Sequence, residues 1–403
     1  MTGPSSFTHS LASSRKAHSG AYGRPWRRRL VGLSFVAVVM LALVELVIRV
    51  PMVALPNPLA TYLYSCYERV NPSRYAFAPL ARLDLWFHRP GFVGRCYFNA
   101  HHWNHKSDAF GWRNPKTWRR ATVALIGDSM IYGHGVDEAD TVAHRLRDRS
   151  GARVANLGIT AGFPGEYLAV MRNFAVRLHP KVIAVYFFAN DLTDLRAFRS
   201  QDQIRAFAET GAAAEAAVVG RQALLADVPP PPAAPPLDWL YLARAVRFFA
   251  LPRRERTGSL AQGLPSDLSF PDHGAPLGFD CGAFERRFEV ELRYVDRAIA
   301  EMHDTAMQRG SQLVVGYLPE PARSATDVCF ARALRRFAAH AGIPLARPRL
   351  HDAAGGPLPG TRLVGDGHLT GAGAEIVAGN LVDVLRRWFT RHPRGGGSVV
   401  GTS

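Results

Sequence analysis

A serine and a histidine far apart in the chain, each beside an aspartate, are the residues whose types and spacing suggest chemistry. Ser129 ends the triplet Gly-Asp-Ser directly after a short apolar run, and His368 ends the triplet Asp-Gly-His near the carboxyl terminus. A serine hydroxyl becomes a nucleophile when a histidine takes its proton, and a carboxylate such as Asp366 orients that histidine. These residues therefore predict a Ser-His-Asp site for acyl transfer.

The Gly-Asp-Ser triplet alone is a weak signal, because a serine after a strand is also a common helix N-cap. Two further blocks strengthen the functional interpretation. Asn156–Gly162 follows the run Arg153–Ala155, and Asn190-Asp191 follows Val182–Phe188. Each block follows a predicted strand, as Ser129 does, so each can place a hydrogen-bond donor beside the serine.

The four blocks in this order resemble those of the SGNH (GDSL-type) hydrolases, and the resemblance covers roughly residues 95–390. It implies that Ser129 is the nucleophile, that His368 is the general base and that Asp366 orients the histidine. It also implies an oxyanion hole formed by the Ser129 N–H, a glycine N–H of the second block, taken as Gly162, and the Asn190 side-chain amide. Activity on ester bonds without a cofactor follows from the same resemblance.

The chain departs from the family pattern at three positions. The family's acid commonly lies three residues before the histidine, where this chain has Gly365, whereas Asp366 lies two before. By counting, the glycine of the second block falls at Ala161, with Gly162 beside it, and Phe188 stands where many members have glycine. An Asp-x-His pair can still orient an imidazole, so Asp366 keeps that role in the prediction.

Strands alternate with helices from Thr122 onward, which predicts an α/β fold with a doubly wound parallel sheet of about five strands, the flavodoxin-like arrangement of SGNH hydrolases. Right-handed crossovers then bring Ser129, Gly162 and Asn190 to one edge of the sheet. The predicted strands are Val123–Ile126, Arg153–Leu157, Val182–Phe188, Gln312–Tyr317 and Ile343–Ala346, and the predicted helices are Ala139–Arg149, Gly165–Leu178, Leu240–Phe249, Phe284–Gln308, Ala331–Ala341 and Ala372–Phe389.

Leu30–Ile48 is almost wholly apolar and about as long as a bilayer core requires. The 29 residues before it contain lysine and arginine but no acidic residue, and no small-residue cleavage site follows before Arg49. This pattern predicts an uncleaved signal anchor, with the amino terminus in the cytoplasm and the catalytic part outside the cytoplasmic membrane. Glu45 near its outer end can either snorkel to the interface or pair with Arg49. A cleaved signal peptide and a buried helix of a soluble protein are the alternatives.

The formal net charge of +16 does not indicate a nucleic-acid partner. Part of it lies in the basic amino-terminal tail, where it determines membrane topology, and arginine supplies nearly all of the rest. No nucleic-acid-binding motif accompanies the charge. Attraction to anionic glycans or lipid headgroups is the alternative use of this charge.

Four cysteines all follow the apolar segment, and an even number outside the cytoplasm predicts disulfides. Three connectivities are possible, of which Cys66–Cys96 with Cys281–Cys329 is the local choice. The cysteines lack metal-binding spacing. His101, His102 and His105 cluster around Trp103 in a stretch that reads as a loop, without a convergent Cys or Asp pair, so no metal site is predicted there.

The predicted organisation has five parts. Residues 1–29 form a basic tail, 30–50 the membrane anchor, 51–120 a lead-in arm that packs on the domain edge, 121–393 the hydrolase domain and 394–403 a disordered tail. Residues 195–283 form an insert within the domain, and its proline run Val228–Pro236 favours an extended segment. The insert is either a lid over the site or a surface elaboration.

Together these features predict a serine ester hydrolase of the acyl or acetyl esterase or lipase type, acting outside the cytoplasmic membrane. Its substrate is a small-molecule, glycan or lipid ester. An O-acyltransferase that modifies cell-envelope polysaccharide would use the same residues. A third hypothesis is a non-catalytic membrane-tethered binding protein. The sequence does not specify the acyl length, the natural substrate or the oligomeric state.

Overall fold

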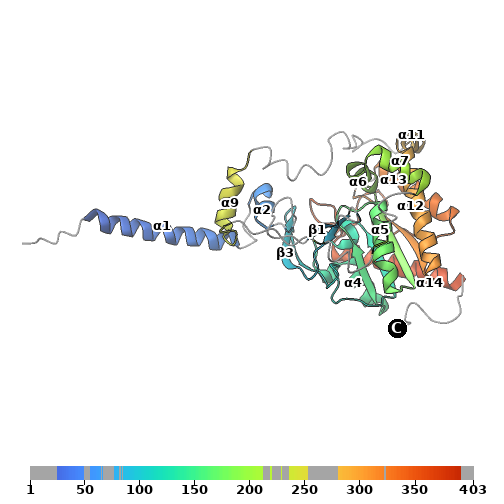
Figure 1. Ribbon diagram of the computed structural model, residues 1–403, viewed down its shortest axis with the longest axis horizontal. Helices are drawn as coiled ribbons and strands as arrows, with labels where there is room; N and C mark the ends of the chain where they lie inside the picture. The colour runs from blue at the N-terminus through green and yellow to red at the C-terminus, as the bar shows by residue number, and fades with distance from the viewer. Residues whose placement is uncertain are drawn as a thin grey trace, which may run out of the picture. The chain divides into compact units, whose positions relative to one another are not determined.

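The computed structural model describes residues 25–49, 55–64, 66, 77–80, 83, 85–211, 218–219, 228, 236–252, 280–321 and 324–391 (Figure 1). The chain divides into two compact units. The first comprises Met1–Val53 with Leu240–Leu242, and the second comprises Ala54–Trp239 with Ala243–Ser403. The basic tail before Pro25, most of the proline run and the tail 394–403 lie outside the described residues.

The first unit contains one long helix, α1 (Pro25–Arg49). An 18-residue window within Trp26–Arg49 has a mean hydropathy of 2.7, so among the described residues this helix is long and apolar enough to cross a membrane, as a signal sequence also is. Near its end, Glu45 pairs with Arg49 at 2.8 Å, as predicted. The same carboxylate accepts the backbone N–H groups of Tyr241 and Leu242, at 3.0 and 2.8 Å.

A five-stranded sheet forms the centre of the second unit, and every neighbouring pair in it is parallel. Its strand order, β6-β5-β7-β8-β9, is the flavodoxin-like order. Apart from the half-buried Phe188, every residue of β6, β5, β7 and β8 is buried, which explains why their sequences are nearly continuous apolar runs. The strands are β5 (Val123–Gly127), β6 (Val154–Gly158), β7 (Val182–Phe188), β8 (Gln312–Leu318) and β9 (Leu345–Ala346). The predicted parallel α/β fold is confirmed.

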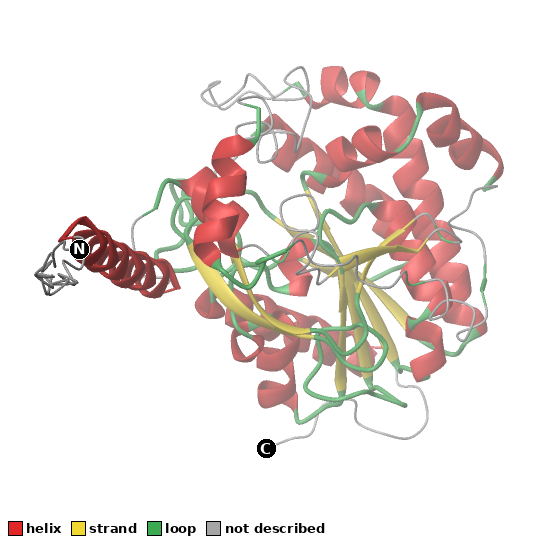
Figure 2. Cartoon of the chain, turned by 60° about the vertical axis from the view of Figure 1, so that its left-hand side comes forward, coloured by secondary structure: helices red, strands yellow, loops and turns green. Residues whose placement is uncertain are grey.

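Helices cover both faces of this sheet, so it is doubly wound, as predicted (Figure 2). On one face lie α4 (Val142–Ser150) and α14 (Gly371–Arg391), whose apolar side chains share a core with the inward side chains of the strands. On the other face lie α5 (Pro164–Asn173), α12 (Glu289–Gln308) and α13 (Ala325–His340).

The remaining described helices are short. They are α2 (Asn57–Tyr64), α3 (Ser129–Tyr132), η2 (Glu138–Asp140), η3 (Ala175–Leu178), α6 (Asp191–Phe198), α7 (Gln201–Thr210), α9 (Tyr241–Ala250) and α11 (Cys281–Arg287). The predicted single helix Phe284–Gln308 is in fact α11 and α12, because Phe288 between them leaves the helical conformation and buries its ring. The first part of the predicted insert packs into the core, where Phe207 of α7 contacts Tyr294 of α12.

Two antiparallel hairpins precede the sheet. One pairs β1 (Phe77–Leu80) with β2 (Leu85–His88), and the other pairs β3 (Val93–Phe98) with β4 (His101–Lys106). The prediction that the histidine cluster lies in a loop is therefore wrong. Trp103 and His105 of β4 are buried at alternate positions, a strand pattern that the polar histidines hide in the sequence.

Two disulfides stabilise the second unit. They join Cys66 to Cys96 and Cys281 to Cys329, which is the local pairing. The first ties the segment after α2 to strand β3 of the second hairpin, and the second ties α11 to α13. Cys66 and Cys96 pack with Trp103 and Tyr132 in a small apolar cluster of their own.

Candidate active site

Ser129 lies directly beyond the carboxyl end of β5, at the point where the strand gives way to a helix. Asp128 caps α3 by accepting the Met130 N–H at 2.9 Å, so that Ser129 is the first helical residue. Gly127 allows the chain to pass close to β7, because a Cβ at this position would lie 2.9 Å from the Tyr186 carbonyl oxygen. Sheets with this strand order bind ligands just beyond the carboxyl ends of the two strands that correspond to β5 and β7.

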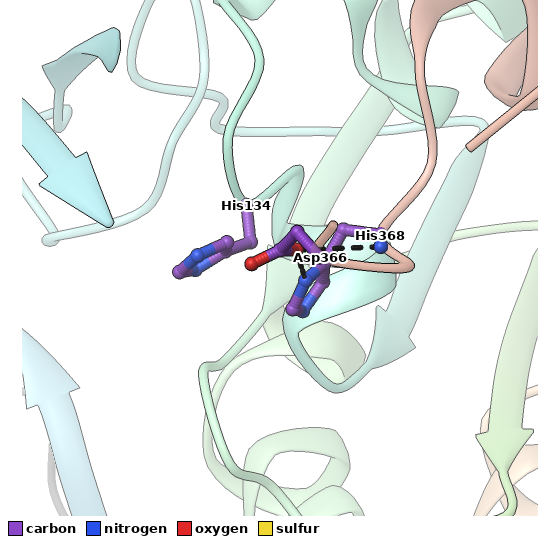
Figure 3. Close-up of side chains that lie close together, drawn as sticks. All are labelled: His134, Asp366 and His368. Atoms are coloured by element: carbon purple, nitrogen blue, oxygen red, sulfur yellow. Dashed lines mark hydrogen bonds and ion pairs between the residues drawn. The ribbon is translucent and has the colours of Figure 1, made fainter. Parts of the chain in front are cut away.

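The side chains of Ser129, His368 and Asp366 form one hydrogen-bonded chain, although the serine and the histidine are 239 residues apart. His368 Nε2 lies 2.8 Å from Ser129 Oγ, within the range for direct proton transfer. His368 Nδ1 bonds to Asp366 Oδ1 (Figure 3). Because a carboxylate only accepts, the proton sits on Nδ1, which leaves Nε2 free to accept from the serine hydroxyl.

The loop around Asp366 explains how an acid only two residues before the histidine can contact it. Gly365 and Gly367 have φ angles of 73° and 83°, a left-handed conformation that glycine adopts without strain. The loop is closed by the Leu363 N–H, which donates to the His368 carbonyl at 2.8 Å. Arg362 also holds it, donating to the Gly367 carbonyl at 3.0 Å. The tight turn brings the carboxylate back onto the ring of its near neighbour.

Asp366 is held in its charged form. Burial of its carboxylate works to raise the pKa, but the hydrogen bond from His368 and the electrostatic interaction between the two groups outweigh burial and hold the pKa well below the usual range. The Asn99 amide contributes in the same direction, donating to Asp366 Oδ2 at 2.9 Å. The acid is therefore an acceptor on both oxygens, as an orienting carboxylate must be.

A second histidine, His134, packs against the ring of His368, a contact that the sequence did not reveal. The two rings are stacked with centroids 4.3 Å apart and planes at 28° (Figure 3). His134 is buried between Gly133 and Gly135, and burial lowers its pKa well below the usual range. It is neutral at pH 7 and holds the face of His368 without adding a positive charge.

Three potential metal ligands also meet here, because donor atoms of His134, Asp366 and His368 lie within 4.8 Å of one another. The hydrogen bonds of Asp366 to His368 and of His368 to Ser129 already use atoms of this group. The arrangement of these atoms suits proton transfer, so we assign no metal to them.

The two remaining predicted site residues lie at the same sheet edge but outside this hydrogen-bonded chain. Asn190 follows β7 and precedes α6, and its side-chain nitrogen donates to Asp194 at 2.8 Å, which uses one of its two hydrogens. Gly162 lies beyond β6, after Ala161, whose φ of 55° turns the backbone sharply. The Tyr167 hydroxyl donates to the Gly162 carbonyl at 3.0 Å and so fixes the neighbouring peptide.

Buried carboxyl groups surround the base of the serine turn. Burial raises the pKa of Asp128 to about 6, and Asp128 Oδ2 has no hydrogen-bond partner within the described chain. Burial also raises the pKa of Asp191 and of Asp194, with the nearby Asp128 adding to both shifts. The Tyr167 oxygen also lies 2.7 Å from Asp191 Oδ1, so its single hydrogen is shared between Asp191 and the Gly162 carbonyl. These groups hold protons more tightly than ordinary carboxyls, which limits the negative charge beneath Ser129.

Comparisons with known proteins give matches only among solved structures. No family model and no curated protein matches the chain. The matched structures include a protein of the G-D-S-L family from Desulfitobacterium hafniense, at 12% identity and a TM-score of 0.37, covering 65% of this chain and 98% of that one. They also include the psychrotrophic esterase EstA from Pseudoalteromonas sp., at 10% identity, a TM-score of 0.37, and 67% and 99% coverage.

A catalytic variant of an acetylxylan esterase from Geobacillus stearothermophilus matches at 11% identity and a TM-score of 0.35, covering 71% of this chain and 99% of that one. Identities and TM-scores this low establish neither an activity nor a substrate for this chain.

Proposed function

We propose that the protein is a serine ester hydrolase with Ser129 as its nucleophile. The observation that carries this proposal is the hydrogen-bonded chain from Asp366 through His368 to Ser129 Oγ, with 2.8 Å between the base and the hydroxyl. A structural serine at a helix N-terminus does not need an oriented imidazole on its hydroxyl. The same chain of contacts supplies the nucleophile, the base and the orienting acid that acyl transfer requires.

In the proposed reaction, Ser129 Oγ attacks the acyl carbonyl carbon while His368 Nε2 takes the hydroxyl proton. Asp366 stabilises the imidazolium that forms, and His368 returns the proton to the departing alkoxide. Water then attacks the acyl-serine with His368 again as base. The developing oxyanion is bound by the Ser129 N–H, the Gly162 N–H and the second hydrogen of the Asn190 amide, each worth about 3 kcal/mol.

We further propose that this reaction takes place outside the cytoplasmic membrane. The basic residues before α1 favour a cytoplasmic amino terminus, and α1 itself is long and apolar enough to span the bilayer. Two disulfides in the second unit fit an oxidising compartment. The substrate would be a small-molecule ester or an ester on a glycan or lipid.

The proposal is tested by p-nitrophenyl acetate hydrolysis with the full-length protein in detergent micelles. Ser129→Ala and His368→Ala should each reduce the rate to that of an uncatalysed control, whereas Ser150→Ala and His179→Ala, outside the site, should hydrolyse like the wild type. Asp366→Asn should lose less than His368→Ala, because the base itself remains.

Labelling with a fluorophosphonate gives a second readout that does not depend on the choice of ester. The probe should bind covalently to the wild type and not to Ser129→Ala. Hydrolysis that survives in either Ser129→Ala or His368→Ala would show that the roles are wrongly assigned. Adding a glycan acceptor and analysing the products would reveal transfer instead of hydrolysis.

A further inference from the structure

The hairpin β3–β4 contacts both of the chain segments that form the candidate site. Its turn reaches the loop that carries Asp366 and His368, and its second strand packs against α3, which begins at Ser129. These two segments are more than 200 residues apart in the chain. The hairpin is therefore in a position to set the distance between the nucleophile and its base.

At the turn, two polar side chains bind the histidine loop. Asn99 donates its amide to Asp366 Oδ2 at 2.9 Å, and His101 donates Nε2–H to the Val364 carbonyl at 2.9 Å. Asn99 and Ala100 have φ angles of 44° and 66°. Two consecutive left-handed residues make the tight turn that two-residue hairpins prefer, and asparagine is well suited to its first position. The turn thus fixes the direction in which the Asn99 amide points.

Along β4, two buried side chains hold Tyr132, the last residue of α3. Trp103 donates its indole N–H to the Tyr132 hydroxyl at 3.1 Å, and His105 Nδ1 lies 2.6 Å from the same oxygen. Burial lowers the pKa of His105, so the ring is neutral and accepts the Tyr132 O–H proton. This pattern fixes the end of the short helix that begins with the nucleophile.

We propose that Asn99 is a positioning residue of the site, and that the β3–β4 hairpin aligns the Asp366–His368 loop with Ser129. This inference rests on the proposed function for its kinetic tests. The side chain of Asp366 is only 1% exposed, so few other groups can replace the amide as a partner for Oδ2. With one oxygen bound by His368 and the other by Asn99, the carboxylate is fixed in rotation and its hydrogen bond keeps the imidazole aimed at Ser129.

Three variants of the turn separate the hydrogen bond from the fold of the hairpin. Asn99→Gly keeps the left-handed turn but removes the amide, and Asn99→Asp keeps the shape but replaces the donor with a carboxylate. Ala100→Gly is the matched control, because it changes the same turn and leaves the amide in place. All are made in the full-length chain.

We expect Asn99→Gly to lower kcat by about 10- to 100-fold with little change in KM, the size of loss that a small misplacement of catalytic groups produces. Ala100→Gly should keep the wild-type kcat. In Asn99→Asp, a second negative charge beside Asp366 favours the imidazolium, so the acid limb of the kcat/KM profile should move to higher pH by about one unit. The other titratable or charged groups around this pair are His101, Asp128, His134 and Arg362, none of which is changed.

A spectroscopic readout tests the inference even if no ester is hydrolysed. The proton shared by His368 Nδ1 and Asp366 should give a far-downfield proton NMR signal in the wild type and in Ala100→Gly, and none in His368→Ala. In Asn99→Gly this signal should be lost to exchange with water. A persistent signal together with a wild-type kcat would overturn the inference.

A fall in kcat with an unchanged signal and unchanged acid limbs would also overturn it, since the role would then be structural only. A failure of the proposed function would give a different experimental result. In that case the wild type would show no Ser129-dependent hydrolysis, while the NMR signal would still report whether Asn99 orders the pair.

Discussion

The imidazole of His368 is held at both ring nitrogens and on one face. Asp366 binds Nδ1, Ser129 lies at Nε2, and the ring of His134 stacks on the face. A ring held in this way loses little conformational entropy when it takes a proton, because its rotation is already fixed. Burial keeps His134 neutral, so it supports the ring without opposing the positive charge that His368 would gain in the proposed reaction.

The carboxyl group of Asp128 is buried, so its ionisation at higher pH costs free energy of folding. Burial raises its pKa from the ordinary 3.8 to about 6, so the folded protein holds this proton more tightly than the unfolded chain. This tighter binding of the proton stabilises the folded protein. The stabilisation is fully present below about pH 4 and is lost as the pH rises through about 6. Asn at this position can keep the cap to Met130 without ever becoming charged.

We accordingly expect the free energy of unfolding of Asp128→Asn, measured relative to the wild type, to increase between pH 4 and pH 8. The gain should be about 3 kcal/mol, since each pKa unit corresponds to about 1.4 kcal/mol. Urea unfolding of the full-length proteins in detergent at several pH values measures it. Asp202→Asn is the control, because that side chain is 97% exposed. Parallel stability curves for Asp128→Asn and the wild type would contradict the prediction.

Some residues of the site could be predicted from the sequence and others could not. Ser129 and Asn190 were identifiable because each follows a strand that is buried on both faces and reads as an apolar run. His134 and Asn99 carry no such signal. His134 lies in a loop, and Asn99 acts through a partner 267 residues away, so only the folded chain brings these contacts together.

At the scale of elements, the sheet was predictable because fully buried parallel strands have a direct sequence signature. The hairpin β3–β4 was not. Its buried positions include Trp103 and His105, and its exposed or half-buried ones include His102 and Asn104, so polar and apolar residues do not simply alternate. Its turn is Asn-Ala, which lacks the glycine that usually marks a two-residue hairpin.

The two disulfides offer a matched comparison of elements. They close loops of similar length, with sequence separations of 30 and 48 residues, so loss of either should lower the free energy of unfolding by about 3 to 4 kcal/mol. Only Cys66–Cys96 holds the hairpin that contacts the site. We expect the paired serine variant of Cys66 and Cys96 to lower both stability and kcat.

The paired serine variant of Cys281 and Cys329 should lower stability and leave kcat nearly unchanged at temperatures where the protein remains folded. Urea unfolding and ester hydrolysis at a low temperature measure the two quantities separately. Equal losses of kcat in both paired variants would show that the hairpin disulfide has no special connection to the site.

At the scale of the whole molecule, the proposed location outside the cytoplasmic membrane rests on the disulfides of the second unit and the composition of the first. Two disulfides in the second unit fit an oxidising compartment, and the basic residues among the first 29 favour a cytoplasmic amino terminus. Six of the basic residues that contribute to the net charge of +16 lie among the first 29, where positive charge favours a cytoplasmic amino terminus.

If α1 is an uncleaved anchor, it stays in the mature protein, whereas a signal peptide is removed. Expressed in a bacterial host, the full-length chain should remain in the membrane fraction after alkaline carbonate extraction, and its intact mass should include Met1–Arg49. Protease added from the outer side of the inner membrane should digest the second unit and spare an amino-terminal tag. Replacing the six basic residues among the first 29 with neutral ones should reduce the fraction in this orientation, because positive charge retains the amino terminus in the cytoplasm. A soluble periplasmic product with a mass that begins after residue 49 would show instead that α1 is a cleaved signal sequence.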